Sequence, residues 1–173
     1  MLAVWRAAME QFEQGEDFVL ATLISVQGSS PRHVGTRFLV RRDGAIVGTI
    51  GGGLIEADVQ KFAAQALERG TSHRASFSFR GRDADSEEMI CGGNAEVLVE
   101  FVKGDDELRK EIFMQIVELT LERRSGYFLS TVNMPVDGNG RVEHVLIEDR
   151  GTRTGEFPGV ELAVHAIPDS RLL

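Results

Sequence analysis

The sequence predicts a single compact α/β domain in which helices pack against a mixed β-sheet. Three observations indicate this class. Apolar residues recur at helical spacing in three segments, β-branched or alternating runs lie between them, and glycines or Asp-Gly pairs separate these runs. The 173 residues suffice for one full domain with its own core.

The first fifty residues predict one helix and three strands. Apolar residues at helical spacing predict a helix over residues 2–14, which Gly15 ends. The continuous apolar run Phe18–Val26 is typical of a strand that is buried on both faces. The apolar runs within residues 37–50 flank Asp43-Gly44, and such a two-residue link predicts a hairpin.

The central part of the chain predicts a helix between strands. Apolar residues at helical intervals predict a helix over residues 54–69, with Gly70 as its terminator. Alternation predicts a strand over 75–79, and a second apolar run predicts another over 95–102. Between them, the polar and acidic start of residues 81–94 predicts a surface loop.

The last seventy residues begin with the clearest helical pattern, over residues 105–124. Its predicted inner face consists of Leu108, Ile112, Phe113, Ile116 and Val117. Strands over 127–134 and 142–147 flank a turn rich in Gly and Asn, which predicts a second hairpin, and residues 162–167 predict a short final strand.

Composition excludes several classes of protein. A net charge of −8 argues against nucleic acid as the main partner, because binding to phosphate backbones relies on a basic face. No apolar run approaches the ~20 residues of a membrane-spanning helix. The N-terminus lacks the pattern of a secretory signal, and one cysteine allows no internal disulfide, so we expect a cytoplasmic protein.

A triple glycine precedes the second predicted helix. Glycines allow close approach to the backbone N–H groups, and a helix that begins near Leu54 adds its positive dipole end. Arg32 and Arg37 lie upstream of this turn, so the segment resembles a cradle for a phosphate. The spacing matches neither the G-x-x-x-x-G-K-[ST] nor the G-x-G-x-x-G fingerprint, and a tight turn without a ligand explains the glycines equally well.

Two further residues allow both a functional and a structural interpretation. Cys91 precedes two glycines, where nearby N–H groups can stabilise a thiolate that binds a soft metal or transfers sulfur. Free cysteines more often act as small buried hydrophobes. Glu56 lies in the first turn of the predicted helix, where a carboxylate already suits the helix dipole.

Four ordered blocks together resemble one family. They are G-S-S-P-R (28–32), G-T-R-F-L-V (35–40), D-G-x-I-V-G-T-I-G-G-G-x-x-E (43–56) and M-I-C-G-G (89–93). In these blocks the chain resembles the XdhC/CoxI family of xanthine dehydrogenase accessory factors, over about residues 10–102. Members of this family bind the molybdenum cofactor, protect it, support its sulfuration with a cysteine desulfurase, and help to insert it into a molybdenum hydroxylase.

The resemblance implies a cofactor chaperone rather than an enzyme that turns over a metabolite. It implies that Cys91 contacts molybdenum or its exchangeable sulfur, and that the glycine turn holds the phosphate end of molybdopterin. The residues that it implies for cofactor binding are Ser29, Ser30, Arg32, Arg37, Gly51, Gly52, Gly53, Glu56, Cys91, Gly92 and Gly93.

The chain also departs from the family pattern. Leu54 stands where many relatives carry cysteine, and the signature of the family's C-terminal Rossmann-like domain is absent. We therefore assign residues 1–125 to the XdhC/CoxI-type domain, with the hairpin and tail of residues 126–173 packed on it. The expected partners are a molybdenum hydroxylase client, a cysteine desulfurase, a separate Rossmann-like accessory subunit and a second copy of the chain.

Two other functions stay open at the level of sequence. One is a cysteine-dependent enzyme that transfers sulfur or phosphate with Cys91, although no obvious base adjoins the thiol. The other is an interaction domain that binds no ligand and only docks a hydroxylase subunit.

Overall fold

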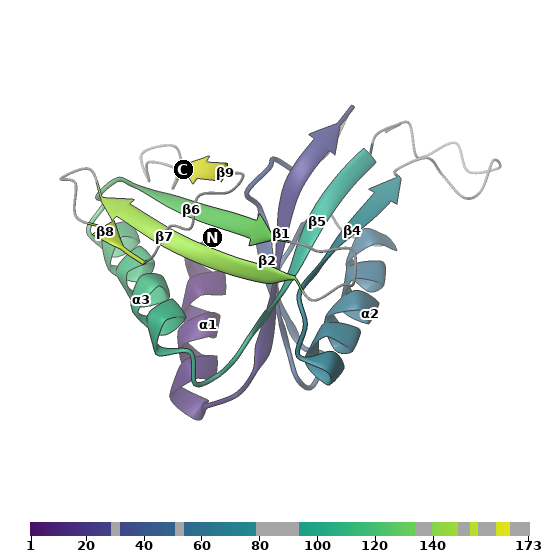
Figure 1. Cartoon of the computed structure of the whole chain (residues 1–173), viewed down its shortest axis with the longest axis horizontal. Helices are drawn as coiled ribbons and strands as arrows, with labels where there is room; N and C mark the ends of the chain where they lie inside the picture. The colour runs from purple at the N-terminus through teal and green to yellow at the C-terminus, as the bar shows by residue number, and fades with distance from the viewer. Residues whose placement is uncertain are drawn as a thin grey trace.

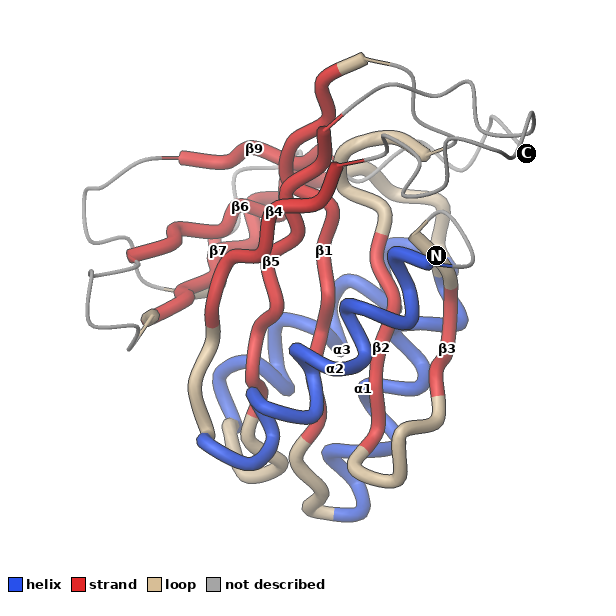
Figure 2. The backbone as a smooth tube through the Cα atoms, turned by 90° about the vertical axis from the view of Figure 1, so that its right-hand side faces the viewer, coloured by secondary structure: helices blue, strands red, loops and turns tan. Residues whose placement is uncertain are grey.

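A five-stranded antiparallel sheet forms the centre of the computed structural model (Figures 1 and 2). The structure describes residues 1–28, 32–50, 54–78, 94–133, 140–148, 153–155 and 162–166. The order of the strands across this sheet is β3-β2-β1-β5-β4. Their bounds are β1 Phe18–Gln27, β2 Arg37–Arg41, β3 Ile46–Gly48, β4 His73–Ser78 and β5 Asn94–Val102.

Helices cover both faces of this sheet, as Figure 1 shows. Helices α1 (Leu2–Gln14) and α3 (Glu107–Leu121) pack side by side on one face, and α2 (Leu54–Arg69) covers the other. Strand β1 lies in the middle and alternates its side chains between these layers, with Phe18 and Leu20 toward α1 and Val19 and Ala21 toward α2. Its first six residues are all buried, which confirms a strand buried on both faces.

A second, four-stranded sheet has the order β8-β7-β6-β9. Its strands are β6 Gly126–Asn133, β7 Arg141–Glu148, β8 Arg153–Thr154 and β9 Leu162–Ala166. Phe128 and Leu146 from this sheet belong to the same apolar cluster as α1 and α3. The hairpin therefore packs on the core of the first sheet, whereas the predicted boundary at residue 125 stays a prediction.

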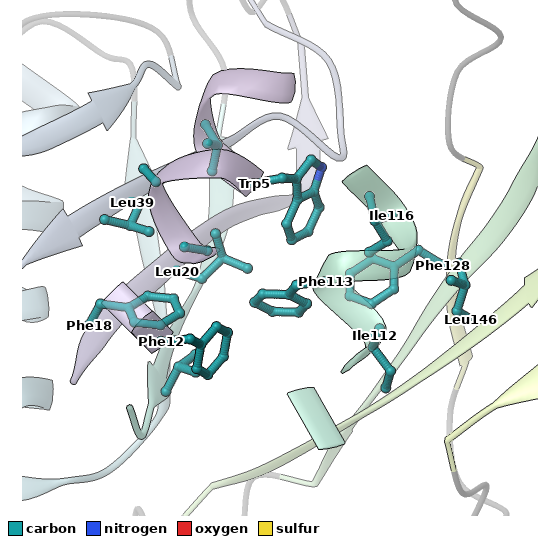
Figure 3. Close-up of a cluster of buried hydrophobic side chains, with 14 of the residues drawn as sticks. Trp5, Phe12, Phe18, Leu20, Leu39, Ile112, Phe113, Ile116, Phe128 and Leu146 are labelled. Carbon is teal, nitrogen blue, oxygen red and sulfur yellow. The ribbon is translucent and has the colours of Figure 1, made fainter. Parts of the chain in front are cut away.

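Aromatic rings fill the space between α1, α3 and the two sheets (Figure 3). Phe113 lies in the middle of this cluster, with its ring centroid 4.9 Å from Trp5, 5.9 Å from Phe12 and 6.2 Å from Phe128. These contacts are edge-on, the geometry that the aromatic quadrupole favours. Because the rings come from two helices and the second sheet, this cluster is what joins the layers.

Local chemistry explains where the elements end. Gly15 ends α1 in the left-handed conformation (φ 67°), and the next amide donates back to the Gln11 carbonyl. In the β2–β3 hairpin, Gly44 also has positive φ (84°), and the Asp43 carboxylate accepts from the Ala45 amide at 2.9 Å. Asp106 caps α3 by accepting from the Arg109 amide at 3.0 Å.

The predicted α/β class with helices packed on a sheet is confirmed, with corrections. All described strand pairs are antiparallel, so the sheet is not mixed. The reason is that hairpins and long returns place neighbouring strands in opposite directions. Leu108 is 46% exposed rather than buried on the inner face of α3, because it lies in the first turn of the helix, beside an open cleft. Strand β8 had no predicted counterpart.

Candidate functional site

Three of the segments predicted to bind the cofactor leave or enter the first sheet at one end. Strands β1 and β3 are both antiparallel to β2, so both end there, and β5 begins there because it is antiparallel to β1. Gln27, near Ser29 and Ser30 in sequence, pairs with Asn94, which follows Cys91, Gly92 and Gly93 directly. The strands thus bring the flanks of these two motifs side by side.

The glycine turn begins lower on the sheet. Gly48, the last residue of β3, is level with Ala21 through the shared partner Phe38. Strand β1 continues six residues further to Gln27, which is about 20 Å at ~3.3 Å per residue. Ser29, Ser30, Gly51–Gly53 and Cys91–Gly93 lie outside the described residues, so their predicted contacts stay predictions.

Arg32 lies in the loop from β1 to β2. The Gly35 amide donates to the Leu23 carbonyl at 2.8 Å, and the Thr36 hydroxyl donates to the His33 carbonyl at 2.7 Å. These bonds fix the return of the chain from the tip of β1 into β2. Arg32 and His33 lie at this turn, and both residues are exposed.

Arg37 takes a different position from the one that the sequence suggests. Its side chain is only 7% exposed and lies over the rings of Trp5 and Phe128, 5.3 Å and 5.2 Å from their centroids. It therefore points to the face of the sheet that α1 covers, away from α2. Burial lowers the pKa of Arg37 to about 10, although the charge of Glu100 opposes this shift.

Within the described part of the chain, the Nε–H group of Arg37 has no hydrogen-bond partner, while its Nη1 donates to the Gly35 carbonyl at 2.9 Å. Contact between Arg37 and a phosphate at Gly51–Gly53 would require the guanidinium to leave this aromatic cage. Its described contacts favour a packing role, and its role in cofactor binding stays a prediction.

Glu56 joins the two sides of the glycine turn. It is the third residue of α2, and its Oε1 atom accepts from the Ile50 amide at 3.2 Å and from the Thr49 hydroxyl. Thr49 and Ile50 precede the three glycines, whereas Glu56 follows them. This carboxylate is therefore directed back across the turn. Thr49 is not among the residues predicted from the sequence. The only sequence feature that could have indicated it is a hydroxyl residue seven positions before a glutamate.

A buried polar network between the two sheets also has no counterpart among the predicted features. Glu100 of β5, 1% exposed, accepts from His144 Nε2 of β7 at 2.7 Å and from Arg109 Nε of α3 at 3.0 Å. His144 Nδ1 lies 2.8 Å from the Ser130 hydroxyl. Burial alone would raise the pKa of Glu100, but His144 and Arg109 outweigh this effect and hold the pKa below its ordinary value.

This Ser–His–Glu arrangement has the bonding order of a nucleophile, a base and its orienting carboxylate. With Nε2–H donating to Glu100, a neutral His144 accepts the Ser130 hydroxyl proton at Nδ1. However, Ser130 is 6% exposed, and the cavity beside it measures about 10 Å³, close to the space that one water needs. The network has no room for a substrate, so it acts as a tie between the sheets.

A wider cleft of about 230 Å³ lies on the other side of His144, between the start of α3 and β7. Both signs of charge line it, from Asp106, Arg109, Arg141 and Glu143. Arg109 and Asp106 pair with each other, as do Arg141 and Glu143 at 2.8 Å. The cleft therefore presents no single charge that selects a ligand.

Among the described residues, neither a metal site nor a membrane-spanning helix is found. These residues hold no group of three or more His, Cys, Asp or Glu side chains arranged to bind a metal ion. No helix within the described ranges has the length and apolar content to cross a membrane.

The segment that carries these features matches a known family. A family model described as the XdhC and CoxI family matches residues 11–78. This segment is therefore similar to the XdhC and CoxI family. The match contains β1, the β2–β3 hairpin, the glycine turn with Glu56, and α2, so it confirms the resemblance drawn from the sequence blocks.

Curated relatives agree with this assignment. The Escherichia coli (strain K12) protein PaoD, named molybdenum cofactor insertion chaperone, is 37% identical over 92 residues, which are 52% of this chain and 28% of PaoD. A Bacillus subtilis (strain 168) protein named as a probable xanthine dehydrogenase subunit is 31% identical over 98 residues, 57% of this chain and 30% of that protein. The E. coli protein YqeB is 38% identical over 100 residues, 56% of this chain and 18% of YqeB.

A solved structure shares the fold. It is a crystal structure of a xanthine dehydrogenase from Bacillus halodurans, with a TM-score of 0.68 and 23% identity over 88% of this chain and 46% of that one. The matched segments span only 18% to 30% of the lengths of the curated relatives. The family segment therefore corresponds to a part of each of these longer proteins.

Proposed function

We propose that this protein is a maturation factor that binds the molybdenum cofactor and assists its insertion into a molybdenum hydroxylase. The observation that carries the proposal is the 37% identity to a protein named molybdenum cofactor insertion chaperone. The alignment with PaoD spans 92 residues of this chain, and the family model matches residues 11–78, which contain the glycine turn.

The described residues are compatible with an anionic ligand at this end of the sheet. The 16-residue helix α2 begins directly after the glycines, and its N-terminal N–H groups favour an anion. Arg32, an exposed residue, places a positive charge on the loop into β2, the strand next to β3. These groups would bind the phosphate end of molybdopterin, while Cys91 would approach molybdenum or its sulfur, and the bound cofactor would supply the redox chemistry of the client.

The test is purification from cells that make molybdopterin, followed by pterin fluorescence and molybdenum analysis. We expect bound pterin in the wild type. Arg32→Ala should weaken cofactor binding about 10- to 100-fold, because it removes a charge-assisted contact worth roughly 1.5–3 kcal/mol. Arg42→Ala is the matched control, since Arg42 is exposed in the turn at the opposite end of β2 and pairs with Asp17.

Cys91 requires a separate variant. Cys91→Ser should retain the fold but lose much of the bound cofactor or of client activation, because serine does not replace a soft thiolate ligand. Full client activation by this variant would remove the thiol from the mechanism. Absence of pterin from the wild type, under conditions where PaoD retains it, would refute the proposed function.

We extend the proposal to partners and location. The names of the relatives support a molybdenum hydroxylase client, and a cysteine desulfurase would supply sulfur in such a pathway. A second copy or a separate Rossmann-like subunit would complete the enclosure of so large a cofactor, since pockets often form between subunits. Light scattering with and without cofactor tests assembly, and fractionation tests the predicted cytoplasmic location.

A further inference from the structure

We propose that Thr49 and Glu56 form a clamp that ties the chain after β3 to the start of α2 across the glycine turn, so that Glu56 is a positioning residue and not a cofactor ligand. This inference rests on the proposed function above. Its evidence lies entirely in residues on either side of the turn: the Glu56 Oε1 atom accepts from the Thr49 hydroxyl and, at 3.2 Å, from the Ile50 amide.

The clamp differs from an ordinary capping box. In that arrangement a glutamate at the third helical position bonds the amide of the residue just before the helix. Here Glu56 reaches past the whole Gly51–Gly53 segment to Ile50, six positions upstream. Glycine loses more conformational entropy on ordering than any other residue, so a bond between the two flanks of a glycine segment restricts the distance between those flanks.

The upstream side of the clamp is itself fixed. Ile50 is 2% exposed and packs in the apolar cluster beneath α2. Gly48, two residues earlier, has φ +97° and lies against Val4 of α1 and the Arg37 carbonyl, where a Cβ atom would come within 2.8 Å and 2.9 Å. The carboxylate of Glu56 is thus bonded to a rigid strand end, and the turn between them has both ends anchored.

The direction of the Glu56 carboxylate also bears on an anionic ligand. A negative charge that faced the phosphate would repel it, whereas this carboxylate accepts bonds from Thr49 and Ile50 on the strand side of the turn. A glutamine has the same shape and retains an oxygen that accepts from both donors. Glu56→Gln should therefore preserve the clamp while removing one negative charge near the site.

Four variants separate a clamp from a direct ligand: Thr49→Val, Thr49→Ser, Glu56→Ala and Glu56→Gln. The probe is freshly released molybdopterin, with the protein-bound fraction measured by pterin fluorescence. We expect Thr49→Val and Glu56→Ala to weaken binding about tenfold, or about 1.4 kcal/mol. Thr49→Ser, which keeps the hydroxyl, should remain within twofold of the wild type, and Glu56→Gln should bind equally well or more tightly.

Amide hydrogen exchange of residues 49–56 supplies a readout without any cofactor. The Ile50 amide should exchange faster in Glu56→Ala than in the wild type or in Glu56→Gln, while exchange in β5 stays unchanged. Binding in Thr49→Val and Glu56→Ala equal to that of the wild type would overturn the clamp and leave the proposed function intact. Weaker molybdopterin binding in Glu56→Gln, with unchanged binding in Thr49→Val, would instead indicate that the charge of Glu56 contacts the cofactor directly.

Absence of binding by the wild type would refute the proposed function and, with it, the positioning role. The exchange experiment would then still decide whether the clamp orders the turn. If the Ile50 amide exchanged at the same rate in Glu56→Ala as in the wild type, the clamp itself would be refuted as well.

Discussion

The buried Glu100 carboxylate gives the sharpest test of how the two sheets are held together. Glu100→Gln keeps the size and planarity of the side chain but removes its charge. The amide oxygen that this substitution introduces still accepts a hydrogen bond, so the contact with His144 Nε2 survives in a weaker form. What is lost is the ionic interaction with Arg109, whose Nε lies 3.0 Å from the carboxylate.

The expected cost follows from these contacts. Removing one member of a buried ion pair typically costs about 3–5 kcal/mol. Arg109 keeps two other partners, the Asp106 carboxylate and the Val142 carbonyl, so its charge is not left uncompensated. Each of the two bonds to Glu100 instead loses the negative charge on its acceptor, a loss of about 1–1.5 kcal/mol each. We therefore expect Glu100→Gln to lower the free energy of unfolding by about 2–3 kcal/mol at pH 7.

The pH dependence has a definite sign. Because the folded-state pKa of Glu100 lies below its ordinary value of 4.5, its stabilisation is fully present above about pH 4.5 and is lost as the pH falls through the folded value. The difference in the free energy of unfolding between the wild type and Glu100→Gln should therefore decrease below about pH 4.5.

Chemical denaturation at pH 7 and between pH 5 and pH 3 measures both effects, with Glu118→Gln on the exposed face of α3 as the control. A Glu100→Gln variant within about 0.5 kcal/mol of the wild type at every pH would refute a charged, structural role, since surface substitutions fall in that range.

Two further predictions concern single backbone and capping positions. Gly48→Ala should lower the free energy of unfolding by about 2–4 kcal/mol, because it adds left-handed strain and a Cβ contact of 2.8 Å with Val4 Cγ2. Gly44→Ala, with similar φ but nothing within 4 Å, should cost only about 1–2 kcal/mol, and equal costs in thermal melts would contradict the packing argument. Asp106→Ala should cost about 1 kcal/mol through loss of the α3 cap, whereas Asp106→Asn retains the cap, so denaturation of both variants isolates the ion pair with Arg109.

Local signals in the sequence predicted most of the elements. Gly15 and Gly44 have the positive φ angles that favour glycine, so the end of the helix and the hairpin could both be predicted from the sequence. The unbroken apolar run after Phe18 predicted burial on both faces, which holds because α1 and α2 cover opposite sides of β1.

Contacts between side chains that are distant in the sequence could not be predicted from it. His144 and Glu100 are 44 residues apart, and each lies in a strand whose neighbours give no sign of a charged partner. The position of Arg37 could not be predicted for the same reason, because the aromatic rings that it contacts, Trp5 and Phe128, belong to distant elements. Single-sequence patterns show that a strand has a buried face but not which side chain lies opposite.

The candidate site shows the same division. The order of the sequence blocks predicted the family, and the family match over residues 11–78 contains the first three blocks but ends before the block at residues 89–93. Register then showed that the flanks of residues 29–31 and 91–93 adjoin through the Gln27–Asn94 pair, whereas the glycine turn starts lower. The bond between Thr49 and Glu56 could not be predicted, because a hydroxyl–carboxylate bond across a turn leaves no periodic pattern in the sequence.

The place of β5 in the first sheet separates the unit of sequence similarity from the unit of folding. The family match ends at residue 78, yet β5, residues 94–102, lies between β1 and β4, which both fall inside the match. A fragment that stopped at residue 78 would leave β4 without its only described neighbour and one side of β1 without partners for its backbone. In this chain, the segment that the family model matches does not complete the sheet on its own, because the interior strand β5 comes from farther along the sequence.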